Sequence, residues 1–242
     1  MRPWHKLQIL ESTEALIPLP NSLYKIEPHP YLSLGAPYGD GVDPWRLRVD
    51  VVRRLLLAQT YLQIKEPKLR FAIFDAWRPI SVQAFMVNHV VDQQCSLRGI
   101  NRLDRKNRIE LQKVVDEVSR FWALPSPNPC TPPPHSTGAA IDLTLADNSG
   151  IPLDMGGQID AISNVSSPDH YAEFCTAYDQ SLSTNYHTRR VLLRKVMHKA
   201  GFMQHPNEWW HFSFGDQMWA WGKNLKEAIY GAYDDESKLL TD

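Results

Sequence analysis

Apolar residues recur every three or four positions along several stretches of the chain, the spacing that places them on one face of an α-helix. The longest such run carries Val52, Leu55 and Leu62, and Asp43-Pro44 ahead of it offers an N-cap residue followed by a proline at the first helical position. The pattern predicts helices over six stretches: residues 45–64, 81–94, 102–122, 169–178, 186–200 and 217–230.

Shorter stretches are alternately or continuously apolar, as β-strands are, and they predict strands over residues 69–74, 141–145 and 209–214. Residues 1–42 have no sustained period and are expected to wrap the core as extended segments and turns. The polar tail over 233–242 is expected to fray. Because helices and strands do not alternate regularly, the sequence predicts one α+β domain over residues 1–242 and not a doubly wound parallel sheet.

Composition and charge narrow the class of protein. Of the 242 residues, 43% are hydrophobic and 22% are charged, which is ordinary for a globular domain. The formal net charge of −1 gives no reason to expect nucleic acid or an anionic membrane as a partner. We see neither a signal-peptide pattern nor the roughly 20 apolar residues of a membrane span. Cys95, Cys130 and Cys175 form no CxxC pair, so we expect buried free thiols in a reducing, cytoplasmic compartment.

Two short segments carry most of the candidate chemistry, one running from His135 to Asp142 and the other from Glu208 to His211. Together they offer two imidazoles and two carboxylates in otherwise apolar sequence. A carboxylate such as Asp142 in an apolar run is costly unless it is paired or bound to a cation. Catalytic zinc takes three protein ligands and leaves a fourth position for water beside a general base. The two segments therefore supply the residue types of a hydrolytic zinc site.

Each segment also has an ordinary structural interpretation. Asp142 could cap a turn and His135 could be a solvated loop histidine, while residues 208–212 could be an aromatic core strand with an exposed Glu208. In a regular strand, Glu208 and His211 point to opposite faces. A shared site therefore requires a bulge or a twisted residue at the entrance of the strand.

A third segment, Asp75-Ala76-Trp77-Arg78, follows an apolar strand. The guanidinium of Arg78 is able to donate two hydrogen bonds to an oxyanion or a carboxylate, and the alternative is an Asp75–Arg78 ion pair within a turn. Four further histidines have no ligand spacing and are expected at the surface: His170, His187, His198 and His205.

The combination Asp75-x-x-Arg78, His135-x-x-Gly138-x-Ala140-x-Asp142 and Glu208-x-x-His211 resembles the zinc D-alanyl-D-alanine dipeptidases of the vancomycin-resistance type. These share a fold with D-Ala-D-Ala carboxypeptidases and the Hedgehog signalling domain, and the resemblance covers about residues 20–225. It implies a small, mostly antiparallel sheet that carries one zinc ion and is flanked by helices. It also implies hydrolysis of the dipeptide D-Ala-D-Ala. The roles that it implies are zinc ligation by His135, Asp142 and His211, general base catalysis by Glu208 and oxyanion stabilisation by Arg78.

Two positions depart from the pattern of these dipeptidases: Pro133 stands where serine is usual, and Trp77 stands where tyrosine is common. Both concern contacts to the substrate and not to the metal. Two other functions stay open on the sequence, a carboxypeptidase or endolysin that acts on longer cell-wall peptides and a zinc-containing binding module without turnover. The presence of both Glu208 and Arg78 favours catalysis, because binding alone needs neither.

Overall fold

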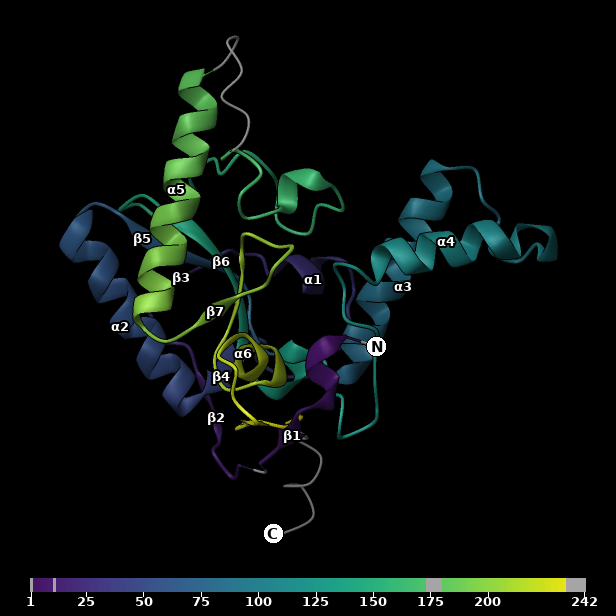
Figure 1. Ribbon diagram of the computed structural model, residues 1–242, viewed down its shortest axis with the longest axis horizontal. Helices are drawn as coiled ribbons and strands as arrows, with labels where there is room; N and C mark the ends of the chain where they lie inside the picture. The colour runs from purple at the N-terminus through teal and green to yellow at the C-terminus, as the bar shows by residue number, and fades with distance from the viewer. Residues whose placement is uncertain (1, 11, 173–179, 234–242) are drawn as a thin grey trace.

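A five-stranded sheet lies at the centre of the computed structural model, which describes residues 2–10, 12–172 and 180–233 (Figure 1). The strand order is β3-β5-β6-β8-β7. The β3–β5 pair is parallel and the other three pairs are antiparallel, which confirms the predicted α+β domain with a mostly antiparallel sheet. The strands are β3 (Tyr24–Lys25), β5 (Arg70–Asp75), β6 (Ala140–Ala146), β7 (Met203–Gln204) and β8 (His211–Ser213).

Two long helices, α2 (Val49–Lys65) and α5 (Gln180–Lys199), pack against each other on one face of the sheet (Figure 1). Alternation along β6 sends Ile141, Leu143 and Leu145 into the core that these helices share with the sheet. The residues between them point to the opposite face. The sheet is therefore closed by helices on one side, and the even-numbered positions of β6 are left for the site.

A second apolar cluster forms around α3 (Ile80–Leu97) and α4 (Arg108–Val118), which extend away from the sheet at the right of Figure 1. Tyr31 and Trp122 belong to this cluster, and their rings lie 5.9 Å apart. The cluster thus reaches from the two helices back to the loops beside the sheet. Tyr31 and Trp122 also contact a residue of the site, described below.

The remaining elements are short. Two small sheets consist of β1 (Gln8–Ile9) with β9 (Glu227–Ala228) and β2 (Leu16–Pro18) with β4 (Arg46–Arg48). The short helices are α1 (Pro30–Ser33), α6 (Gln217–Gly222) and the 3₁₀ helices η1 (Pro3–Lys6), η2 (Arg105–Asn107), η3 (Pro134–Thr137) and η4 (Asn164–Ser166). The N-terminal part of the chain consists of short elements joined by turns, namely η1, β1, β2, β3 and α1. Residue 11 lies outside the described residues.

The predicted start of the first long helix at Asp43-Pro44 is wrong. Residues Arg46–Arg48 form strand β4 with β2, and helix α2 begins only at Val49. The Asp43 carboxylate accepts a hydrogen bond from the backbone N–H of Trp45 at 2.8 Å, so it closes a turn and caps no helix. The pairing of β4 with β2 has therefore prevailed over the helix-start pattern at Asp43-Pro44.

The helix predicted over residues 102–122 is shorter in the structure, because turns occupy its first part. The side chains of Asn101 and Asp104 accept backbone N–H groups two residues ahead, and α4 begins after them. For the helix predicted over residues 169–178, residues 169–172 form turns and the rest lies outside the described residues, as does Cys175.

The helix predicted over residues 217–230 ends at Gly222. Asn224 adopts a left-handed backbone conformation, with φ of 55°, and the N–H of Leu225 returns to the carbonyl of Ala220 at 2.8 Å. The chain is then free to pair as β9 with β1. Residues 234–242, most of the predicted tail, lie outside the described residues.

Among the residues that the structure describes, no helix combines the length and the apolar character needed to cross a membrane. Cys95 and Cys130 are both free thiols, as predicted, and Cys95 is buried; the prediction of burial is wrong for Cys130, which is exposed. The cytoplasmic location stays a prediction.

Candidate metal centre

Strand register places three candidate residues side by side across the sheet. Asp142 of β6 is opposite His211 of β8 on one side and Asp75 of β5 on the other. An irregularity in β5 between Ile73 and Asp75 makes the second pairing possible, because an extra residue in β5 lets Asp75 face the same side as Asp142. His135 joins them from η3, whose C-cap Gly138 adopts φ of 70° and turns the chain into β6.

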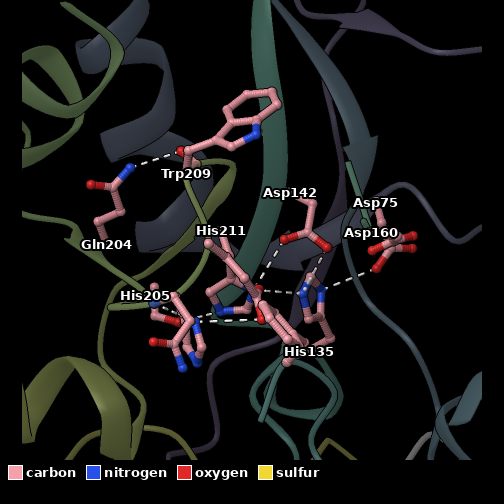
Figure 2. Close-up of polar contacts among 12 residues, drawn as sticks. Asp75, His135, Asp142, Asp160, Gln204, His205, Trp209 and His211 are labelled. Carbon is pink, nitrogen blue, oxygen red and sulfur yellow. Dashed lines mark hydrogen bonds and ion pairs between the residues drawn. The ribbon is translucent and has the colours of Figure 1, made fainter. Parts of the chain in front are cut away.

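His135, Asp142 and His211 converge on one point (Figure 2). Nε2 of His135 lies 3.2 Å from Oδ2 of Asp142 and 3.2 Å from Nδ1 of His211, and that Nδ1 lies 3.0 Å from Oδ1 of Asp142. In a tetrahedral zinc site with bonds of about 2.0–2.1 Å, ligand atoms lie about 3.3 Å apart. All three residues are buried. The spacing therefore fits one small metal ion between the three side chains.

The polar atoms of the three side chains support this fit. Oδ1 of Asp142 is buried and has no hydrogen-bond partner among the described residues. Burial raises the pKa of Asp142, but the neighbouring His135 and His211 outweigh it and hold the pKa well below its usual range. An anionic oxygen without a donor is costly in a buried site unless a cation faces it.

Hydrogen bonds at the far side of each imidazole hold the two rings in position. Nδ1 of His135 lies 2.6 Å from the carbonyl oxygen of Ala76 and 3.1 Å from Oδ2 of Asp75, so the ring proton sits on Nδ1 and the lone pair of Nε2 faces the centre. Nε2 of His211 lies 3.4 Å from the hydroxyl of Ser213, which leaves Nδ1 for the centre. This is the arrangement of ring nitrogens that metal-binding histidines adopt.

Arg78 lies beside this cluster and is tied to two of its carboxylates. Its Nε is 2.9 Å from Oδ2 of Asp75 and its Nη2 is 3.6 Å from Oδ2 of Asp142. The guanidinium also lies 5.2 Å from the ring centroids of both Tyr31 and Trp122. Its Nη1 is buried without a hydrogen-bond partner among the described residues. Both sequence interpretations of Arg78 are therefore compatible, since the ion pair with Asp75 fixes a guanidinium that still has a donor to offer.

Glu208 and His211 lie at the same site, although in a regular strand they would point to opposite faces. Strand β8 begins only at His211, so Glu208 lies in the preceding turn, where its N–H donates to the carbonyl of His205 at 3.4 Å. The expectation of a strand over residues 209–214 was too long at both ends, and alternation does not apply to Glu208. Its Oε2 comes within 3.7 Å of Nδ1 of His211. Burial, reinforced by Asp142, raises the pKa of Glu208 well above its usual value.

His205 was expected at the surface, and this prediction is wrong. It is 3% exposed, and its Nδ1 lies 3.4 Å from Oε1 of Glu208. The backbone N–H of His205 donates to the carbonyl of His211 at 2.9 Å across the β7–β8 hairpin. Recognising this hairpin in the sequence would have placed His205 beside the candidate metal ligands, whereas the spacing of histidines could not.

Asp160 was not singled out in the sequence either. It sits in an irregular loop with φ of 67° and accepts a hydrogen bond from the hydroxyl of Tyr31 at 2.9 Å. Burial, together with the charge of Asp142, raises the pKa of Asp160 to about 7. No periodic pattern surrounds it, so the sequence offered no signal for its position.

A small pocket, with a cavity volume of about 30 Å³, lies in front of the three metal-site residues. Aromatic and aliphatic side chains supply part of its wall, and polar and charged groups supply the rest. The apolar part is formed by Phe121, Trp122, Ala123, Pro134 and Trp210, and the charged part outside the metal site by Arg2, Arg78, Asp160 and Glu208. A pocket of this composition suits a small, charged ligand.

Residues 43–230, most of the chain, match the peptidase M15 family model described as D-Ala-D-Ala dipeptidase. The chain belongs to this family of metallopeptidases. The resemblance seen in the sequence is thereby confirmed, and the buried His-Asp-His cluster lies within the matched residues.

Individual relatives agree with the M15 assignment. A D-alanyl-D-alanine dipeptidase of Synechocystis sp. is 41% identical over 229 residues, which are 93% of this chain and 92% of the relative. The D-alanyl-D-alanine dipeptidase of Enterococcus faecium is 34% identical over 66% of this chain and 72% of its own. Among solved structures, the zinc complex of a mutant vancomycin-resistance D,D-pentapeptidase covers 92% of this chain and 96% of its own, with 11% identity and a TM-score of 0.46.

Proposed function

We propose that this M15 family member hydrolyses the dipeptide D-Ala-D-Ala with one zinc ion held by His135, Asp142 and His211. The observation that carries the proposal is the convergence of these three buried ligand atoms at mutual distances of 3.0–3.2 Å. Two imidazoles and one carboxylate are a donor set of catalytic zinc. When bound there, zinc would supply Lewis acidity to the scissile carbonyl and lower the pKa of a coordinated water.

Glu208 is the general base of this proposal. Its carboxylate lies beside the metal ligands without forming part of the triad, 3.7 Å from Nδ1 of His211. It accepts a proton from the attacking water and then delivers it to the leaving amine. Because burial raises the pKa of Glu208, the carboxyl group is able to hold the proton between the two steps.

Arg78 stabilises the negative oxygen that develops as the carbonyl is attacked. Its unpaired Nη1 is the donor available for this role, and the ion pair with Asp75 fixes its direction. A donor that is already in place needs no reorganisation when the charge develops. Asp75 acts through Arg78 and His135 and contacts no substrate in this scheme.

Asp160 is positioned to receive the ammonium group of the substrate. Its carboxylate lines the pocket and, among the described side chains, is hydrogen-bonded to the hydroxyl of Tyr31. In a longer peptide this ammonium is replaced by an amide, which brings no charge to Asp160 and needs room beyond it. We therefore expect free D-Ala-D-Ala to be preferred over longer peptides with the same ending.

The proposal is tested by measuring the free alanine that the zinc-loaded protein releases from three substrates. These are D-Ala-D-Ala, L-Ala-L-Ala and a pentapeptide ending in D-Ala-D-Ala. We expect turnover of the first and at least 100-fold lower kcat/KM for the other two, an effect of about 2.7 kcal/mol. A comparable kcat/KM for the pentapeptide would identify a carboxypeptidase. Full zinc occupancy without turnover of any substrate would identify a binding module.

A further inference from the structure

Arg2 lies in the wall of the pocket, where it contacts His205 although 203 residues separate the two along the chain. Its Nη1 is 2.8 Å from Nε2 of His205, and its Nη2 donates to the carbonyl oxygens of Ser119 at 3.0 Å and Phe121 at 3.4 Å. The guanidinium also lies 5.2 Å from the ring centroid of Trp4. Contacts from two distant parts of the chain thus hold this side chain at the pocket.

The charge of Glu208 acts on Arg2, but Arg2 has no direct ion-pair partner among the described residues. No carboxylate of a described residue lies within the 4.0 Å of an ion pair. A guanidinium has five N–H donors, and the three bonds to described residues leave two for a ligand. Burial lowers the pKa of Arg2 even though Glu208 opposes the shift, so an anion beside the guanidinium would relieve an unfavourable state.

Arg78, the other arginine of the pocket, is in a different situation. Asp75 and Asp142 lie at 2.9 and 3.6 Å from its guanidinium nitrogens and balance its charge. A substrate carboxylate placed there would meet two carboxylates of the protein. Arg2 is therefore the better partner for an anionic group of the substrate.

The pocket also has opposite charges on either side of the metal-site residues. Asp160 lies on one side of the His135–Asp142–His211 cluster and His205, which contacts Arg2, lies on the other (Figure 2). A dipeptide zwitterion carries its ammonium and carboxylate groups at opposite ends. With the ammonium at Asp160, the carboxylate reaches toward Arg2.

We propose that Arg2 binds the C-terminal carboxylate of the dipeptide and makes the free carboxylate a requirement for tight binding. This inference rests on the proposed dipeptidase function. In this proposal Arg2 contacts the substrate and determines specificity, but it takes no part in proton transfer. It belongs to the segment of the chain that precedes the central sheet.

The test compares D-Ala-D-Ala with D-alanyl-D-alanine amide, which lacks the negative charge. In the wild type, we expect the amide to show at least a 10-fold higher KM than the free acid. Arg2→Gln should raise KM for the free acid by about 10- to 100-fold, change kcat by less than about 3-fold and leave KM for the amide unchanged. Lys6→Gln, an exposed position of the same segment, is the matched control and should match the wild type.

A binding measurement keeps this test separate from turnover. In the Glu208→Gln background, calorimetry should show a 10- to 100-fold higher Kd for D-Ala-D-Ala when Arg2→Gln is added. An unchanged preference for the acid over the amide, or no difference in Kd, would overturn the role of Arg2 while the dipeptidase function stands. A decrease in kcat alone would indicate that Arg2 positions His205 and does not bind the substrate, and it would also overturn the proposed role of Arg2. Wild-type binding without turnover would instead refute the proposed function alone.

Discussion

Replacing Glu208 by glutamine should lower kcat for D-Ala-D-Ala by about 100- to 10,000-fold and leave one zinc ion bound per chain. Glutamine keeps the volume of the buried side chain but cannot accept and return a proton. The pocket and the contact to His205 should persist, so KM should change little. Steady-state kinetics and zinc analysis on the same preparation measure the two quantities.

The matched control is Glu117→Gln, an exposed carboxylate that pairs with Arg98 at 2.6 Å on the surface. It should leave both kcat and zinc content unchanged, because surface ion pairs contribute little. Loss of zinc together with activity in Glu208→Gln would show that Glu208 is a ligand. A near-normal kcat with zinc bound would show that another residue is the general base.

Replacing Arg78 by lysine should lower kcat by about 100-fold with little change in KM. Lysine preserves the positive charge that Asp75 needs, which avoids an unpaired buried carboxylate. It lacks the planar fork, however, so it cannot bind Asp75 and present a second donor to the developing oxyanion in fixed geometry. The kinetic constants of the variant, compared with those of the wild type, give the effect.

Arg98→Lys, the partner of the surface control above, should behave as the wild type. An Arg78→Lys effect confined to KM would make Arg78 an anchor of the substrate carboxylate, which is the role assigned here to Arg2. The two arginines are thus distinguished by kinetics, since Arg78 is expected to act on kcat and Arg2 on KM.

Local context singled out two of the candidate metal-site residues, and the resemblance to the dipeptidase family implied their roles. His135 follows three prolines and precedes Gly138, and Asp142 interrupts an apolar strand. A carboxylate in an apolar strand is costly unless it is paired or bound to a cation, so Asp142 could be noticed from the sequence alone. Their convergence depends on the β5–β6–β8 register, which local patterns did not supply.

Other parts of the site depend on contacts that sequence patterns do not record. His205 reaches Glu208 through the β7–β8 hairpin, Asp160 sits in an irregular loop, and Arg2 comes from the far end of the chain. The start of helix α2 was misplaced for the same kind of reason, since β4 pairs with a strand about 30 residues earlier. Tertiary pairing decided these features over local propensity.

The most direct test of the central claim is a crystal structure of the protein with zinc, measured on both sides of the zinc absorption edge. We expect one strong anomalous peak within about 2.0–2.2 Å of Nε2 of His135, Nδ1 of His211 and a carboxylate oxygen of Asp142. Glu208 should lie outside bonding distance of the peak. A zinc ion at any other position, or this cluster without a peak in protein that carries one zinc per chain, would contradict the assignment.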